Sequence, residues 1–242
     1  MCRVWTRFQA TRSDGTSVKL RIEDLSESRF EDAVELFIQY FVLEETFHKA
    51  VGVARNPQAV AEARVIVTES MKDPAYHYVI CCEDRDDDEV GQTVGASSIE
   101  LTTIGPEPFE GIKLESDEMQ KMFEMLAATT NLHIIMEELH ISIFYDDRGM
   151  IVHPEFRQLG IAREFLKTRC LACVTNNVPA TGALMTSIAT QKAAEKDNWE
   201  TVLEVDLQEF GRKHGVTFED GGVSKLMIWK NPQYKAPQKI QA

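Results

Sequence analysis

The sequence contains no run of eighteen apolar residues, so nothing in it predicts a membrane-spanning helix. Its first residues, Met1 to Trp5, lack the charged and then apolar pattern of a signal peptide. Its five cysteines are an odd number without the spacing of a secreted disulfide framework. We therefore expect a cytoplasmic protein with no membrane partner.

Positive charge is scarce: 26 Lys and Arg residues stand against 39 Asp and Glu residues, which gives a net charge of −13. Because nucleic acids are bound by basic patches, we expect no nucleic-acid partner. An acidic protein attracts cations, which suits a positively charged amine, although simple solubility explains most of the charge. We expect a monomer.

Metal-ligand patterns are also missing. Cys170 and Cys173 have metal-ligand spacing, but no second Cys or His pair lies near them, and on a helix this spacing is more typical of two small buried residues. None of the candidate histidines has metal-ligand spacing with another ligand, and we assign no metal. These histidines are His48, His133, His140 and His153. His48 is close enough to Glu45 to relay a proton, but a surface position is the favoured interpretation.

The 242 residues are enough for one full hydrophobic core, and hydrophobic periodicity predicts an α/β fold with a mixed sheet. We predict one domain over 1–242, with loose segments at about 1–17 and about 231–242. Strands are predicted at 18–22, 76–82, 93–101, 180–185, 201–206 and 224–230, and in a segment that ends at Val152. Helices are predicted from Ser26, from Asn56, and over 118–128, 131–139 and 186–198, with another after residue 160. Residues 83–89 are predicted to form a charged turn, and the Met119, Met122, Phe123 and Leu126 stripe is predicted to lie in the core.

The stretch from Val152 to Ala162 predicts a strand, a turn and the start of a helix. Pro154 cannot donate to a strand ladder and should end the strand. Gly160 permits a close backbone approach, and Ala162 keeps the same surface small. The first N–H groups of the helix then point outward and form an anion site that suits a phosphate or pyrophosphate. Arg157 adds positive charge at its mouth.

The spacing excludes two common phosphate loops. A Walker loop needs Lys-Ser/Thr after its last Gly, where Ile161-Ala162 stands, and a dinucleotide fingerprint needs further glycines. The remaining pattern, in which Arg157, Gly160 and Ala162 fill the defining positions, resembles the acetyl-CoA pyrophosphate loop of the GNAT acetyltransferase superfamily. The alternative is an ordinary strand-to-helix turn. The resemblance implies an acetyl-CoA site made by Met150, Ile151, Val152, Arg157, Gln158, Leu159, Gly160, Ile161, Ala162 and Lys192.

The resemblance extends from about Val18 to Lys230 and implies a single-domain GNAT fold with a mostly antiparallel central sheet flanked by helices. It is closest to the insect-type arylalkylamine N-acetyltransferases, in which the glutamate of a D-E-P-L-N segment is the catalytic base. Residues 44–48, E-E-T-F-H, stand in that place. Glu45 therefore takes the position of the base, while Thr46 replaces the Pro and His48 replaces the Asn.

A second family segment, S-x-x-x-S-A-R-x-x-E-K-L-G-F, is similar to residues 186–199. Thr186 and Thr190 take the two serine positions and keep the hydroxyl groups. By this resemblance they order a water molecule or protonate the departing thiolate. The alternatives are a helix cap for Thr186 and a solvent-facing hydroxyl for Thr190. Vertebrate relatives have a general-acid Tyr where this chain has Ala194, so that acid is absent.

The chemistry requires a base because an alkylamine is mostly protonated at cellular pH and must lose a proton before it attacks a thioester. We expect Phe41 and Phe47 to desolvate Glu45 and raise its pKa, which suits a base. The alternative is a surface pair, Glu44 and Glu45, at a helix end. Free N–H groups along Met150–Val152 can stabilise the tetrahedral intermediate, and Gly149 is expected to mark a β-bulge that frees them.

These observations predict an enzyme that transfers the acetyl group of acetyl-CoA to a small primary amine, with an arylalkylamine as the expected acceptor. One alternative acceptor is a polyamine or another non-aromatic amine. An alternative from another class of protein is a CoA-binding sensor or scaffold without catalysis. Glu45 and the two threonine hydroxyls weigh against that last alternative.

Overall fold

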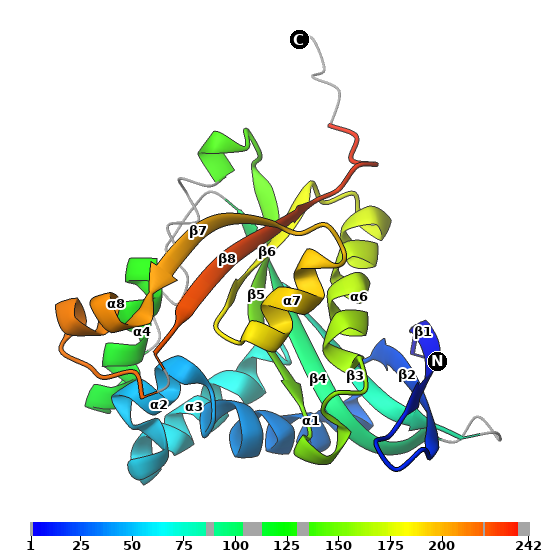
Figure 1. Cartoon of the computed structure of the whole chain (residues 1–242), viewed down its shortest axis with the longest axis horizontal. Coiled ribbons are helices and arrows are strands. Elements are labelled where there is room, and N and C mark those ends of the chain that lie inside the picture. The colour runs from blue at the N-terminus through cyan, green and yellow to red at the C-terminus, as the bar shows by residue number, and fades with distance from the viewer. Residues whose placement is uncertain (1, 86–89, 104–112, 130–135, 220, 237–242) are drawn as a thin grey trace.

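The computed structural model describes residues 2–85, 90–103, 113–129, 136–219 and 221–236. Eight strands form one sheet in the order β1-β2-β3-β4-β5-β6-β8-β7 (Figure 1). Only β5 and β6 pair in parallel, so the predicted mixed and mostly antiparallel sheet is confirmed. The strands are β1 (Val4–Thr11), β2 (Ser17–Asp24), β3 (Tyr76–Asp84), β4 (Val90–Thr103), β5 (Ile143–Val152), β6 (Ala180–Met185), β7 (Glu200–Asp206) and β8 (Val223–Lys230).

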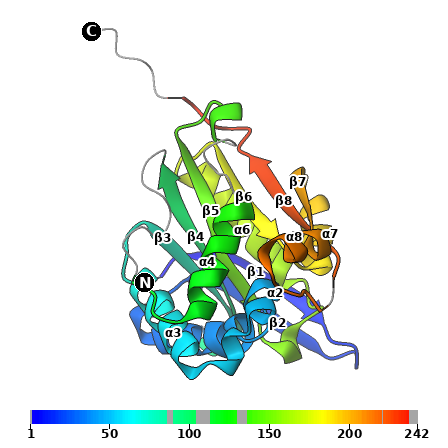
Figure 2. The same ribbon diagram turned by 90° about the vertical axis from the view of Figure 1, so that its left-hand side faces the viewer.

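Helices cover both faces of the sheet. One face carries α1 (Phe30–Leu36), which continues as a π-helical segment (Phe37–Val42), and then α2 (Thr46–Val51), α3 (Pro57–Ser70) and α4 (Asp117–Thr129). In Figure 2, α2, α3 and α4 lie on the side of the sheet that faces the viewer. The other face carries α6 (Ile161–Thr175) and α7 (Ile188–Glu195). Helix α8 (Leu207–His214) follows β7, and its Leu207 packs in the core on the side of α1 to α4. No helix in the described part of the chain is long and apolar enough to cross a lipid bilayer.

The apolar run in β3 is explained by these two layers. Tyr78, Ile80 and Cys82 pack on the face covered by α1 to α4, whereas Val79 and Cys81 pack toward α6. Because successive side chains of a strand point to opposite faces, a strand covered on both sides must be apolar throughout. The predicted strand and its antiparallel return in β4 are confirmed.

The expectation of a loose segment over residues 1–17 is wrong for Val4–Thr11, which form β1 and pair with β2. As an edge strand, β1 is at most half buried, so its sequence carries no strong alternation. Helices α2 and α8 are additional to those predicted, and the predicted helix at 186–198 is shorter, at Ile188–Glu195. The predicted charged turn, the 131–139 helix and the tail fall partly outside the described residues, at 86–89, 130–135 and 237–242.

The sheet splits between β5 and β6. Their parallel ladder pairs only Tyr145 with Thr181 and Asp146 with Gly182, and beyond Asp146 strand β5 stays paired with β4 alone. The last residues of β5 therefore keep backbone groups that face the gap instead of a neighbouring strand. The gap leads to the N-terminus of α6, and this position creates the groove described below.

Candidate active site

A groove of about 730 Å³ follows the gap between β5 and β6. One wall is made by the end of β5 and the opposite wall by the end of β6. The lining residues from these strands are Asp147, Met150, Ile151, Val152, Ala183, Leu184 and Met185. Met150, Ile151 and Val152 are the residues predicted to present free backbone groups. The groove therefore lies where the strand ladder is missing, which is the reason that backbone donors and acceptors are available in it.

The groove ends at the N-terminus of α6. The first helical hydrogen bond runs from the Glu164 N–H to the Gly160 carbonyl (3.1 Å), so the amides of Ile161 and Ala162 have no acceptor within the helix. Gly160 has φ +81°, and a Cβ built on it meets no atom within 4 Å. Glycine is therefore needed at this position for its positive φ and not for close packing, and the space beside it is open.

Cationic side chains gather along this groove although the protein carries a net charge of −13. Among the described lining residues the cations are Lys49, Arg157, Arg163, Arg169, Lys192 and Lys196, and the acids are Glu44, Glu45 and Asp147. The Arg157 guanidinium forms an ion pair with Glu44 (2.8 Å) and donates to the Val152 carbonyl (3.2 Å). An excess of positive charge beside free helix amides suits a ligand that carries phosphate groups.

The structure brings the predicted cofactor residues together. Met150, Ile151, Val152, Arg157, Gln158, Gly160, Ile161, Ala162 and Lys192 all line the groove. Leu159 is the exception, because its side chain packs against the apolar cluster between α6 and the sheet. Thr190 also lines the groove from α7.

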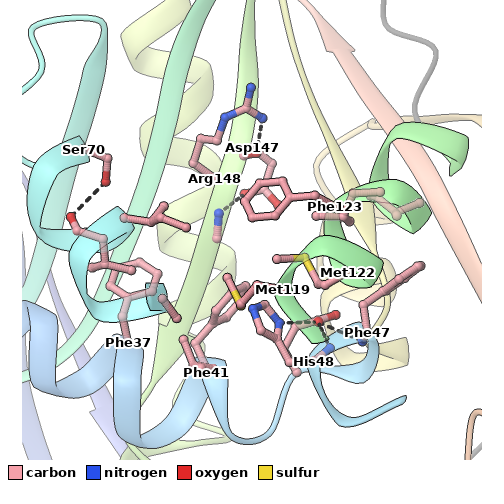
Figure 3. A pocket seen from close by; sticks show the side chains of 18 of the residues that line it. Phe37, Phe41, Phe47, His48, Ser70, Met119, Met122, Phe123, Asp147 and Arg148 are labelled. Atoms are coloured by element: carbon pink, nitrogen blue, oxygen red, sulfur yellow. Dashed lines mark hydrogen bonds and ion pairs between the residues drawn. The ribbon is translucent and has the colours of Figure 1, made fainter. Parts of the chain in front are cut away.

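A second cavity of about 200 Å³ lies between the sheet and helices α1 to α4 (Figure 3). Its walls are largely aromatic or long apolar side chains, and these include Phe37, Phe41, Phe47, Tyr76, Tyr78, Met119, Met122, Phe123 and Leu126. Met119 and Met122 are buried, as the predicted core stripe requires, but they also line this cavity. A pocket of this composition suits an apolar, ring-sized ligand.

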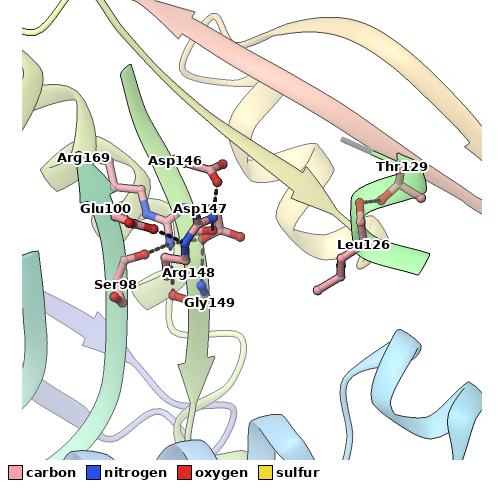
Figure 4. Close-up of polar contacts among 9 residues, drawn as sticks. All are labelled: Ser98, Glu100, Leu126, Thr129, Asp146, Asp147, Arg148, Gly149 and Arg169. Carbon is pink, nitrogen blue, oxygen red and sulfur yellow. Dashed lines mark hydrogen bonds and ion pairs between the residues drawn. The ribbon is translucent and has the colours of Figure 1, made fainter. Parts of the chain in front are cut away.

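Charged residues of β5, which Figure 4 shows with their polar contacts, line this second cavity. Arg148 donates to Glu100 (Nε to Oε2, 2.6 Å) and pairs with Asp146, while Arg169 pairs with Asp147 (2.6 Å). Burial raises the pKa of Asp146, and it raises the pKa of Tyr76 to about 12. The sequence analysis missed this cluster. Its signal was the run D-D-R inside a strand, since buried charges in a strand must be paired and often mark a site.

The expected bulge at Gly149 is confirmed by the register of β4 and β5. Ser97 pairs with Met150 and Ile99 with Asp147, so Arg148 and Gly149 together face Ser98. Gly149 has φ +111°, and a Cβ built there meets the Phe37 ring at 3.0 Å and the Phe41 ring at 3.2 Å. The bulge therefore sets the wall between the strand end and the aromatic cavity.

Glu45 lies where the two cavities meet. Both are lined by Phe41, Glu45, Asp147, Leu184 and Thr186. Glu45 is the N-cap of α2, and its Oε2 accepts hydrogen bonds from the Phe47 amide (2.8 Å) and the His48 amide (3.1 Å). The Thr186 hydroxyl donates to Oε1 (3.3 Å), which joins the two predicted catalytic residues.

The expectation of a raised pKa for Glu45 is wrong. Burial raises the pKa of this carboxyl, but hydrogen bonds from the His48 ring and amide and from the Phe47 amide, together with the charge that the His48 ring can carry, outweigh burial. The pKa therefore lies below the ordinary value of 4.5. The reason is that Glu45 caps a helix, and the sequence analysis did not predict α2. Glu45 is accordingly ionised at neutral pH.

The expectation that His48 lies at the surface is also wrong. Only 8% of the residue is exposed to solvent, and His48 lines the aromatic cavity. Of the two cysteines with metal-ligand spacing, Cys173 is buried and Cys170 half-buried on α6. Among the described residues, no group of three or more His, Cys, Asp or Glu side chains is placed to hold a metal ion.

The sequence matches no protein-family model and no curated protein. The structure is similar to that of the Aedes aegypti protein named arylalkylamine N-acetyltransferase 7, with a TM-score of 0.83, 22% identity and 95% of each chain covered. It is also similar to arylalkylamine N-acetyltransferase 2 of Aedes aegypti (TM-score 0.68, 18% identity, 87% of this chain and 98% of that one). A Drosophila melanogaster polyamine N-acetyltransferase that forms N-acetylagmatine matches with a TM-score of 0.65 and 8% identity, over 87% of this chain and 99% of that one. The chain therefore has the GNAT acetyltransferase fold, in the form found in these insect proteins.

Proposed function

We propose that this protein transfers the acetyl group of acetyl-CoA to a small primary amine, and that the acceptor is an arylalkylamine. The observation that carries the proposal is the meeting of two unlike cavities at Glu45 and Thr186. One is a long groove with cationic walls and free helix amides, and the other is a smaller, largely apolar pocket. A group-transfer enzyme needs this arrangement, because donor and acceptor must enter separately and react where their sites join.

The groove has the chemistry that acetyl-CoA requires. The amides at the start of α6, with Arg157 and Lys192, suit the pyrophosphate. On the side that faces away from β4, the backbone of Met150 to Val152 has no partner strand, and this edge suits the amide-rich pantetheine arm, which would extend the sheet as a strand does. In this orientation the thioester lies toward Glu45, and main-chain N–H groups near the bulge can stabilise negative charge on its carbonyl oxygen.

The second cavity favours an arylalkylamine over a polyamine. A polyamine carries several charges along its length and would have to leave water for walls of Phe, Tyr, Met and Leu side chains. An aromatic ring gains from the same walls, and its single ammonium can remain at the polar junction. The acidic groups of β5 are the feature that favours the polyamine alternative, but Arg148 and Arg169 already pair with them.

Glu45 and the threonines have separate roles in this proposal. The ionised Glu45 carboxylate attracts the substrate ammonium to the junction. As the family resemblance implies, Glu45 also takes part in removing a proton from that ammonium. Thr186 fixes the orientation of Glu45 through Oε1. Thr190, on the groove wall, is the hydroxyl available to order water or to protonate the departing thiolate.

The test is release of free thiol from acetyl-CoA by the purified protein with a panel of amines. The panel pairs phenethylamine, tyramine and dopamine with agmatine, spermidine and short alkylamines. We expect the aryl compounds to have the highest kcat/KM. Transfer to agmatine or spermidine with no aryl activity would establish the polyamine alternative. Calorimetric binding of acetyl-CoA without turnover of any amine would instead establish the CoA-binding sensor.

A further inference from the structure

We propose that His48 is the group that takes the proton from the acceptor ammonium, and that Glu45 acts by orienting the His48 ring and pairing with it. This inference rests on the proposed acetyl transfer and names the base for it. It differs from the assignment that the family resemblance implies, in which a glutamate carboxylate is itself the base. The difference arises because this chain has His where the similar insect segments have Asn.

The His48 side chain is held in one orientation. Its Nδ1 lies 2.9 Å from Glu45 Oε2, and the two side chains are 10% and 14% exposed. The Phe41 ring packs edge-on against the imidazole, with 5.6 Å between ring centroids and an interplanar angle of 68°. Figure 3 shows the imidazole between Met119 and Phe47, at the border of the aromatic cavity. A ring with one nitrogen bonded and one face packed has little freedom to turn away from the cavity.

The hydrogen bond to Glu45 also determines which ring nitrogen can accept a proton. A carboxylate can only accept hydrogen bonds, and Glu45 is ionised because its pKa is lowered. Nδ1 must therefore carry the hydrogen in the neutral ring, which leaves the lone pair on Nε2. Within the described residues no hydrogen bond to Nε2 is formed. Nε2 is thus a free acceptor on a residue that lines the acceptor cavity.

Glu45 is less suited to accept the proton. Its Oε2 already receives hydrogen bonds from the Phe47 amide, the His48 amide and the His48 ring, and its Oε1 receives one from Thr186. A carboxylate stabilised in this way has a lowered pKa and is a weaker base. The same carboxylate lies 2.9 Å from the His48 ring, so an imidazolium formed there has an opposite charge beside it, as in other acid–imidazole pairs.

The proton balance is as follows. The substrate R–NH₃⁺ gives one proton to His48 Nε2, and the resulting imidazolium is paired with the Glu45 carboxylate. The freed nitrogen lone pair forms the C–N bond at the thioester carbonyl, and the C–S bond breaks. The departing thiolate takes the second proton from the nitrogen, by way of water or a hydroxyl such as Thr190. His48 then releases its proton to solvent, so the net products are amide, free thiol and one proton.

The test compares His48→Asn with His77→Asn. Asn can still donate a hydrogen bond to Glu45 but cannot accept a proton, and it is the residue at this position of the similar insect segments. His77 forms a matched imidazole–carboxylate contact, with Nε2 2.9 Å from Asp24 Oδ1, and it lines neither the groove nor the aromatic cavity. His48→Gln is measured as well, so that a folding defect in one variant does not decide the result.

We expect His48→Asn to lower kcat by about 10²-fold or more, as removal of a general base does. The affinity for acetyl-CoA, measured by calorimetry, should change less than twofold, and His77→Asn should keep the parent kcat. The loss should shrink for acceptors with a low amine pKa, which need no base, and added imidazole should restore part of the rate. A purely structural role for His48 predicts neither of these last two results.

The proposal is overturned if folded His48→Asn and His48→Gln keep the parent kcat with a fully protonated amine. It is also overturned if kcat falls equally for all amines and imidazole restores nothing. If the parent protein transfers acetyl to no amine, it is the proposed function that fails, and this outcome is distinct because it appears before any variant is made.

Discussion

Gly149→Ala is predicted to be the most damaging single-methyl substitution in the wall between the two cavities. Gly149 has φ +111°, which residues with a side chain rarely adopt, and its added Cβ would lie 3.0 Å from the Phe37 ring and 3.2 Å from the Phe41 ring. Backbone strain of this kind costs about 1–3 kcal/mol. Overpacking against the buried Phe37 ring and the half-buried Phe41 ring adds about 1–3 kcal/mol.

The two contributions together lower the free energy of unfolding by about 4 kcal/mol, the middle of the combined range. For a chain of this length that corresponds to a fall of roughly 8–16 °C in the melting temperature. If the bulge survives, the displaced Phe41 ring narrows the acceptor cavity, so KM for the amine should rise while the affinity for acetyl-CoA changes little. Urea unfolding, thermal unfolding and steady-state kinetics measure these three effects.

Gly15→Ala is the matched control. Gly15 also has a positive φ, +85°, but a Cβ built there meets no atom within 4 Å. Its substitution therefore carries strain alone, about 1–2 kcal/mol. If the two variants lose the same free energy of unfolding, the Phe37 and Phe41 rings yield without cost. The argument that the bulge fixes the cavity wall would then be refuted.

Three further predictions concern the groove and Glu45. Gly160→Val should weaken acetyl-CoA binding at least tenfold in calorimetry, because a β-branched residue cannot adopt φ +81° without moving the α6 amides. Unchanged affinity in a folded variant would contradict the phosphate-loop assignment. Arg157→Ala should weaken acetyl-CoA binding by on the order of 1–3 kcal/mol at low salt. Glu44→Gln should strengthen the binding, because Glu44 pairs with Arg157 at the groove mouth and neutralises its charge. Equal effects of the same sign in both variants would contradict this pairing. Glu45→Gln should lower the free energy of unfolding at pH 7, and the difference from the parent should vanish in acid. Because the folded pKa of Glu45 lies below 4.5, the stability that the ionised carboxylate contributes is present above that value and is lost as pH falls through the folded pKa. Urea unfolding at several pH values measures this difference.

The residues from Val152 to Ala162 show what the sequence determined by itself. Pro154 ends the strand, a residue with positive φ precedes α6, and the helix amides open into the groove, as the order of residue types required. These are local consequences of backbone geometry, since a proline lacks its N–H and a helix leaves its first amides unpaired whatever surrounds it. Hydrophobic periodicity determined the buried strands for the same reason, because alternation and apolar runs follow directly from burial.

The tertiary structure decided the electrostatics and the chemistry. Glu45 is buried by segments that meet only in the folded chain, and the donors that lower its pKa, the Phe47 and His48 amides and the His48 ring, are in place only because α2 forms. The Thr186 hydroxyl, which donates to Glu45 Oε1, is 141 residues away in the sequence. The ion pairs of Arg148 and Arg169 likewise join three separate elements. Edge strand β1 exists because β2 offers it a partner. Energies of this kind depend on distance and desolvation between segments that are remote in sequence, so residue patterns alone do not contain them.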